Sequence, residues 1–366
     1  MAQQPISPAQ QEKEIIANVG IAGLGTAIAV ETGGQLGEGI EAVRARGYWE
    51  LVWLRFKRDK VAIASGVAIV LLVLTAYGGA PIARHFIGHG PNTNFLPFCC
   101  PGGEAVSLPS LLPVGPGAHV NNPYTHKKDI MLLGASNRLG QDEFLRLLYG
   151  AQISLEVAGI STLGVMLIGV VLGSIAGFFR GWSDTAISRL TEITMAFPIL
   201  IFAISLAATI GPQLNNVTLW GAFPNGVVTL VLIFVLFGWF YPCRIMRAQV
   251  MSIREKEYVE AARMIGASDA RIIRSHVLPH LVAPIIVYST LIIASFVLFE
   301  AGLSFLGLGI QFNASWGNLL STAPDYYTTR PLLMLWPGLA VLVTTLAFNL
   351  LGDGLRDAFD PRAAQH

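Results

Sequence analysis

Residues 257–279 read EYVEAARMIGASDARIIRSHVLP, a polar stretch that stands between two long apolar segments of the chain. Its first part is rich in strong helix formers. Four residues in that part recur at helical spacing and are predicted to share one face of a helix: Tyr258, Ala261, Ala262 and Ile265. Gly266 follows as a natural helix stop. We expect glycine there because a side chain would clash in the turn.

A second short helix is predicted after this glycine. Ser268 or Asp269 can cap its start, it runs to about Val277, and Pro279 ends it. A connection between two membrane spans needs only a few residues, whereas this one is long and well punctuated. We therefore interpret residues 250–283 as a rigid loop of two hinged helices on which a partner protein can push.

The composition excludes an ordinary soluble protein. Hydrophobic residues make up 53% of the 366 residues and charged residues only 13%, whereas soluble domains carry about 25% charged residues. The net charge of +1 implies no strongly basic face, which argues against a nucleic-acid binder. We interpret the chain as an all-α integral membrane protein.

Six apolar segments are predicted to be transmembrane helices, since a bilayer core takes about 20 helical residues to cross. They are 61–80, 153–179, 187–210, 227–242, 285–306 and 332–351. Glu156 interrupts the second segment near its start. Most of the 24 Lys and Arg residues lie inside if the N-terminus is cytoplasmic. The positive-inside rule therefore places both termini in the cytoplasm.

These spans divide the chain into regions. The predicted regions are a cytoplasmic region 1–60, the first transmembrane helix 61–80, an extracytoplasmic loop 81–147, a five-helix transmembrane core 148–352 and a cytoplasmic tail 353–366.

Two stretches leave alternatives open. Residues 48–60 alternate aromatic and basic side chains, which is typical of a helix lying on the inner leaflet; the alternative is a simple cytoplasmic extension of the first span. In the outer loop, Cys99 and Cys100 form a vicinal disulfide, pair with another chain, or remain two thiols.

Three parts of the polar loop form a spaced motif: Glu260-Ala261-Ala262, Gly266 and Leu278-Pro279. This spacing resembles the signature of bacterial binding-protein-dependent ABC importer permeases, with His276 where that family often has Ile. The resemblance implies a type I ABC importer permease fold, in which the loop supplies a coupling helix that docks on the ATPase subunit. The residues that it assigns to this coupling are Glu257, Tyr258, Glu260, Ala261, Ala262, Gly266, Ala267 and Pro279.

Further segments are similar to the C-type permeases of oligopeptide and dipeptide importers, namely 132–134, 140–142, 146–151, 301–309, 315–318 and 348–357. The resemblance implies a complex in the bacterial cytoplasmic membrane with a second permease, one or two ABC ATPases and an extracytoplasmic peptide-binding protein. The implied cargo is di- or oligopeptides, and the same machine for nickel, glutathione or a sugar is the alternative. An ion-coupled secondary transporter is a more distant alternative, which calls for charges buried in several spans.

No catalytic site and no cofactor are predicted for the chain itself. It has no GxxxxGK[ST] motif, so we expect ATP and Mg to be bound by partner subunits. His276 and His280 have a metal-like spacing, but no third ligand is near them in the sequence. Glu300 is a costly charge inside the fifth span. Either it lines the substrate path or contacts the partner permease, or it caps the Gly-rich stretch 302–309.

Overall fold

The computed structural model describes residues 47–95, 114–122, 128–214, 217, 223–310 and 313–360. Met1–Arg46 and Gly47–His366 form two separate units, and the fold below is that of the second. Cys99, Cys100 and the first 46 residues lie outside the described ranges, so the predictions made for them stay predictions.

Helices dominate the described residues. In chain order the helices are α2 (Tyr48–Phe56), α3 (Lys60–Leu74), α4 (Ala80–Ile87), α5 (Glu143–Phe179), α6 (Gly181–Ala196), α7 (Ile199–Leu214), α8 (Val227–Gly238), α9 (Phe240–Arg254), α10 (Glu257–Met264), α11 (Asp269–Ile272), α12 (Leu278–Phe305), α13 (Trp316–Thr322) and α14 (Leu332–Phe359). The shorter elements are two π-helical turns, η1 (Thr75–Gly79) and η2 (Ile273–Val277), a 3-10 turn η3 (Ala323–Asp325), and two strands, β1 (Ala118–Asn121) and β2 (Lys128–Met131).

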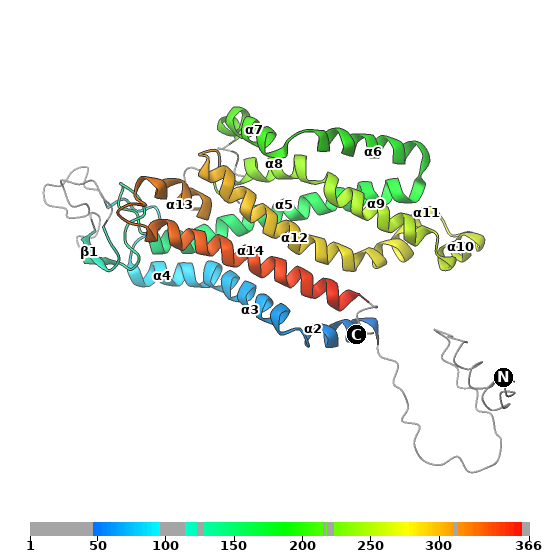
Figure 1. The fold of residues 1–366 in the computed structure, drawn as a ribbon, viewed down its shortest axis with the longest axis horizontal. Helices are drawn as coiled ribbons and strands as arrows, with labels where there is room; N and C mark the ends of the chain where they lie inside the picture. Colours follow the sequence, from blue (N-terminus) through cyan, green and yellow to red (C-terminus); the bar gives the residue numbers. More distant parts are fainter. Residues whose placement is uncertain are drawn as a thin grey trace, which may run out of the picture. The chain divides into compact units, whose positions relative to one another are not determined.

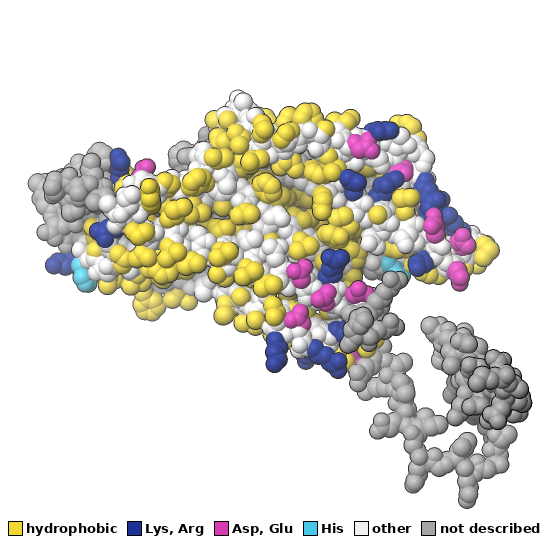
Figure 2. Space-filling model, viewed as in Figure 1, with side chains coloured by type: hydrophobic (Ala, Val, Ile, Leu, Met, Phe, Trp, Pro, Cys, Tyr) yellow, Lys and Arg dark blue, Asp and Glu magenta, His cyan; other side chains and the backbone are white. Residues whose placement is uncertain are grey.

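Four continuous helices are long and apolar enough to cross a membrane, namely Lys60–Ile87, Glu143–Phe179, Asp269–Phe305 and Leu332–Phe359. Two further candidates are bent pairs, α6 with α7 and α8 with α9, and they bring the number to six if each pair is one span. Charged side chains gather toward the two ends of this bundle, and a largely hydrophobic surface lies between them (Figure 2). Such a surface suits lipid rather than water.

The predicted span 187–210 is not one straight helix, because the chain bends by 79° between α6 and α7. Pro198 stands at the break, and Phe197 before it is extended, with φ −86° and ψ 132°. A proline ring disfavours the helical conformation of the preceding residue, so the two helices cannot join into one. A smaller bend of 43° separates α8 from α9, inside the predicted span 227–242.

A proline follows each π-helical turn at the same distance. Pro81 comes two residues after η1, and Pro279 comes two residues after η2. Proline has no backbone N–H, and its ring clashes with the carbonyl four residues earlier. The residue before each proline donates its N–H to the carbonyl five residues back, which is the wider π-helical pattern. The π turn thus lets each helix accommodate its proline without a break.

The prediction that Pro279 ends the second helix of the loop is therefore wrong. The helix that begins at Asp269 continues through η2 into α12 and ends at Phe305. Other helices also extend past their predicted limits. α5 starts at Glu143, ten residues before the predicted span, and α14 reaches Phe359, within the segment predicted as a tail.

α5 packs closely on α9 through three glycines, Gly169, Gly173 and Gly177, which we call the glycine stripe. A Cβ atom at Gly173 would lie only 2.6 Å from the carbonyl oxygen of Cys243, and the other two positions leave similarly little room. Small residues four apart let helices in a membrane approach closely. The stripe therefore fixes α9, which leads into the polar loop, against α5.

The described part of the segment 81–147 has structure of its own. β1 and β2 pair in antiparallel register, with Ala118 opposite Met131. The buried His89 ring lies between two carboxylates: Nδ1 is 3.0 Å from Asp129 Oδ2, and Nε2 is 3.1 Å from Asp142 Oδ2. His89 thereby ties the end of α4, the hairpin and the start of α5 together.

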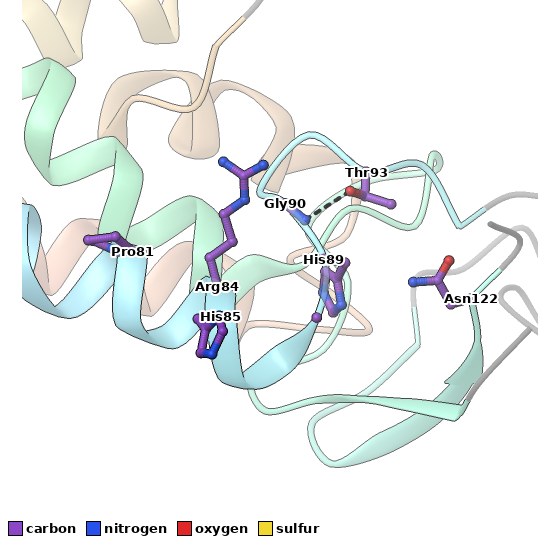
Figure 3. Close-up of a pocket in the computed structure, with 8 residues that line it drawn as sticks. Pro81, Arg84, His85, His89, Gly90, Thr93 and Asn122 are labelled. Carbon is purple, nitrogen blue, oxygen red and sulfur yellow. Dashed lines mark hydrogen bonds between the residues drawn. The ribbon is translucent and has the colours of Figure 1, made fainter. Parts of the chain in front are cut away.

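A cavity of about 610 Å³ lies beside this cluster, next to the last turn of α4 (Figure 3). Pro81, Arg84 and His85 line it from α4, and the loop that follows is closed by a bond from Gly90 N–H to Thr93 Oγ1 at 3.0 Å. The segment 81–147 is thus more ordered in its described parts than its low sequence periodicity indicates.

The first described helix, α2, contacts the end of the last one, α14. Arg55 Nη1 donates to the carbonyl of Asp360 at 2.7 Å, and the rings of Trp49 and Phe359 are 6.1 Å apart. In Figure 1, α2 and the end of α14 lie toward the same end of the bundle as α10, whereas β1 lies at the opposite end. The position of α2 on the inner leaflet stays a prediction, as does the cytoplasmic location of both termini.

Candidate functional site

α10 is anchored to the bundle by two buried residues. Val259 is fully buried and Ala262 is 6% exposed. Both belong to one apolar cluster with Phe178 of α5, Ile253 of α9 and Ile272 of α11. Because the cluster draws on α5, α9 and α11, a displacement of α10 disturbs all three elements.

The end of α10 is a Schellman motif. Gly266 has a φ of +82°, its N–H donates to Arg263 O at 3.0 Å, and Ala267 N–H donates to Ala262 O at 3.0 Å. No atom lies within 4 Å of the position that a Cβ would take on Gly266. The predicted clash is therefore wrong. Glycine is needed because L-residues with a side chain rarely adopt this backbone conformation.

The opposite side of α10 is exposed and carries both charge and apolar groups. We call it the docking face and define it by Glu257, Glu260, Ala261, Met264 and Ile265. Met264 is 83% exposed and Ile265 is 85% exposed. The two carboxylates lie in the first turn of α10, where the helix dipole stabilises negative charge. An acidic start and an apolar tip on one short exposed helix suit contact with another protein.

Tyr258 connects α10 to the start of α12. Its ring stacks on His280, with centroids 5.4 Å apart and 17° between the planes. Burial raises the pKa of the Tyr258 phenol, so its hydroxyl stays protonated at neutral pH. His280 Nδ1 is 2.7 Å from the carbonyl of His276. Across the described ranges no three metal-ligating side chains come together. Both histidine rings lie beside the ring of Tyr258.

Further contacts join the loop to the end of α5. The guanidinium groups of Arg254 and Arg263 lie 5.8 Å and 5.2 Å from the ring centroid of Phe178. Arg180, directly after α5, forms an ion pair with Glu255. Cation–π contacts at exposed sites contribute about 0.5–1 kcal/mol each. The loop is thus attached to α5 as well as to α9 and α12.

Residues 169–365, which include the whole loop, match the family described as "binding-protein-dependent transport system inner membrane component". The chain belongs to this family. Residues 47–97 also match the N-terminal TM domain of oligopeptide transport permease C. This inner membrane component is a multi-pass permease subunit of an ABC importer, and such subunits are not enzymes themselves. The predicted all-α membrane protein with the type I importer permease fold is confirmed.

Three curated relatives cover most of the inner membrane component. It is 34% identical to a dipeptide transport system permease protein of Alkalihalophilus pseudofirmus, over 86% of this chain and 90% of the relative. It is 34% identical to a glutathione transport system permease protein of Pectobacterium atrosepticum, over 86% and 91%. It is 31% identical to an oligopeptide transport system permease protein of Bacillus subtilis, over 86% and 90%.

The residues predicted for the coupling contact divide into two groups in this inner membrane component. The exposed ones are Glu257, Tyr258, Glu260, Ala261, Gly266 and Pro279, whereas Ala267 is partly buried and Ala262 is buried. Of the four residues predicted to share one helix face, only Ala262 is buried, and it packs on the bundle together with Val259. Ala262 therefore anchors α10 and is covered by the chain's own residues.

Met264 and Ile265 are the docking-face residues that the sequence interpretation missed. Met264 is seven residues after Glu257 and four after Glu260, so helical spacing alone puts the three side chains on one face. The glycine stripe was missed as well, although its four-residue spacing is visible in the sequence.

Glu300 is fully buried within the chain. Ser154 Oγ and Ser304 Oγ donate to its carboxylate at 2.9 Å and 2.8 Å, and Ser315 bonds it as well. In the described chain Glu300 thus holds α5, α12 and the start of α13 together. Both roles considered for it from the sequence stay predictions.

Proposed function

We propose that this inner membrane component is one of two unlike permease subunits through which an ABC importer moves di- and oligopeptides by alternating access. The docking face carries the proposal. It presents Glu257, Glu260, Met264 and Ile265 on a helix that is anchored by Val259 and Ala262. The names of the dipeptide and oligopeptide relatives favour a peptide as the cargo.

The proposed coupling uses two routes through the chain. ATP and Mg are bound and hydrolysed by partner ATPase subunits, and their motion reaches α10 at the docking face. One route runs through the Tyr258–His280 stack into α12, which is part of the continuous helix Asp269–Phe305. The other runs through Phe178 into α5. The bundle then changes between inward-facing and outward-facing states, and an extracytoplasmic peptide-binding protein supplies the cargo.

Purification of the native complex through a tag on this chain tests the proposal. We expect to recover a second, different permease, one or two ATPases and a peptide-binding protein. In proteoliposomes the complex should import labelled dipeptides only when ATP is supplied to the ATPase side. A complex without an ATPase, or import driven by an ion gradient alone, would overturn the assignment.

Glutathione is a second candidate cargo, favoured by the relative that is named a glutathione transport permease. Glutathione is a modified tripeptide with a free amino group and free carboxylates. Competition between glutathione and trialanine for ATP-driven uptake separates the two: if glutathione is the cargo, it should displace trialanine at far lower concentration.

A further inference from the structure

Glu156 is a carboxylate that the coupling site does not use. It lies on α5, 23 residues before the end of that helix at Phe179, which is about 34 Å at the helical rise. The hydrocarbon core of a bilayer is about 30 Å thick. Because the coupling loop stands at the opposite end of α5, this distance places Glu156 at the outer mouth of the bundle.

The carboxylate opens on a cavity of about 410 Å³. Tyr149, Gln152 and Glu156 line one wall from successive turns of α5. Asn92 and Asn313 line it as well, and Asn92 Nδ2 is 3.5 Å from Asn313 Oδ1. We call this space the Glu156 cavity. Its described wall thus combines one negative charge with neutral amide and phenol groups and with apolar side chains such as Phe223.

The π turn η1 supports this wall. Ala80 N–H donates to Thr75 O, so the carbonyl of Ala76 is left without its usual helical donor. Gln152 Nε2 donates to that carbonyl at 2.6 Å. Tyr77, the next residue of η1, donates its hydroxyl to Glu156 Oε1 at 3.2 Å. These bonds position the Glu156 side chain and leave its charge unneutralised.

The ion pairs found between described side chains do not include Glu156. Glu156 is also half-buried rather than enclosed, unlike Glu300, which three serines surround. A carboxylate held by one neutral donor at the wall of an open cavity is suited to a passing cation. A single carboxylate offers too few ligands for a metal ion, whereas an ammonium group needs only one such acceptor with neutral acceptors beside it.

We propose that the Glu156 cavity is a subsite for the primary ammonium group at the amino terminus of the peptide as it enters from the outer side. This inference rests on the proposed function, because it takes the cargo to be a peptide. Glu156 holds the ammonium, and Gln152, Tyr149 and the Asn92–Asn313 pair line the space around it.

The test uses the complete reconstituted transporter with its binding protein and compares ATP-driven uptake of trialanine and N-acetyl-trialanine. Glu156→Gln keeps the shape and removes the charge. We expect it to lower trialanine uptake about tenfold, since hydrogen bonds to charged groups contribute about 1.5–3 kcal/mol, and to change N-acetyl-trialanine uptake much less. Preferences of the binding protein act equally on both forms of the transporter and so cancel in this comparison.

Three further variants serve as controls. Glu156→Asp keeps the charge and should retain most of the trialanine uptake, which also covers the case that Glu156→Gln fails to assemble. Tyr77→Phe removes the bond that positions the carboxylate and should lower trialanine uptake less than Glu156→Gln does, because the charge remains. Glu192→Gln removes an exposed carboxylate that pairs with Arg189 on α6 and should change neither uptake.

Equal loss of both peptides in Glu156→Gln, or no loss of either, overturns the subsite while leaving the proposed function intact. Uptake of neither peptide by the wild-type transporter overturns the peptide cargo and the subsite together. Selective loss of trialanine uptake supports both.

Discussion

Gly266 shows how a single residue sets the direction of the coupling loop. Space does not restrict it, since no atom lies within 4 Å of a Cβ at this position. Its backbone conformation restricts the position to residues that tolerate a φ of +82°. In this conformation the N–H groups of Gly266 and Ala267 cap α10. Gly266 therefore fixes the angle between α10 and α11, the helix that follows it.

Replacing Gly266 tests this role. We expect Gly266→Val to cost about 1–2 kcal/mol, the usual penalty for a left-handed residue with a side chain, and to fray the end of α10. The measurement is the number of peptides imported per ATP hydrolysed, which should fall. Gly266→Asn should behave nearly as wild type, because Asn tolerates positive φ. Normal coupled import by the Val variant would contradict the loop assignment.

Two adjacent alanines allow a sharper test at the residue scale. Ala262 is buried and Ala261 is exposed. Ala262→Leu should overpack the cluster around Val259 and lower the free energy of unfolding by about 1–3 kcal/mol. Ala261→Leu should leave the melting temperature unchanged and instead reduce ATPase retention on the purified complex. Equal thermal shifts for both variants would show that the two faces are misassigned.

At the scale of elements, proline and glycine decide how helices continue and how closely they approach. Pro198 separates two helices, whereas Pro81 and Pro279 are accommodated by π turns. The sequence could not distinguish these outcomes, because a missing N–H is satisfied by ending a helix or by widening it. At Pro279 the buried Val277 and Leu281 hold the helix on both sides of the proline in one cluster, a tertiary contact that no local pattern shows.

The glycine stripe makes a quantitative prediction for α5. A Cβ at Gly173 would approach the Cys243 carbonyl at 2.6 Å, while one at Gly159 of the same helix meets nothing within 4 Å. Gly173→Ala should therefore push α9 away and lower the melting temperature in detergent by several degrees. Gly159→Ala should raise it slightly, since Ala favours a helix by about 1 kcal/mol over Gly.

At the scale of the whole molecule, the lengths of the apolar segments were the main basis for predicting the fold from the sequence. Helix class and the regions of the candidate spans could be predicted, because a bilayer demands long apolar runs. The bends between helices, the extensions of helices past their predicted ends and the buried side-chain contacts could not be predicted. The bonds of His89 to Asp129 and of Glu300 to Ser154 join residues far apart in sequence. Likewise, whether Val259 or Tyr258 faces the bundle depends on neighbours from three other elements.

Site-directed labelling tests the predicted orientation. In a background with Cys99 and Cys100 changed to Ser, and with Cys243 buried, single cysteines report the side of the membrane. Lys128→Cys, on β2, should react with a membrane-impermeant maleimide on intact spheroplasts. Met264→Cys, on the docking face, should react only after permeabilisation. The reverse pattern would place both termini outside.

The bend between α6 and α7 has a consequence for how the chain enters the membrane during synthesis. Each helix has 16 residues, about 24 Å, which is too short to cross a bilayer core of about 30 Å alone. Asp184 of α6 pairs with Arg247 of α9, a residue made 63 positions later. The segment from Gly181 to Arg254 is therefore expected to settle in the bilayer as one delayed step, after its last helix has left the ribosome.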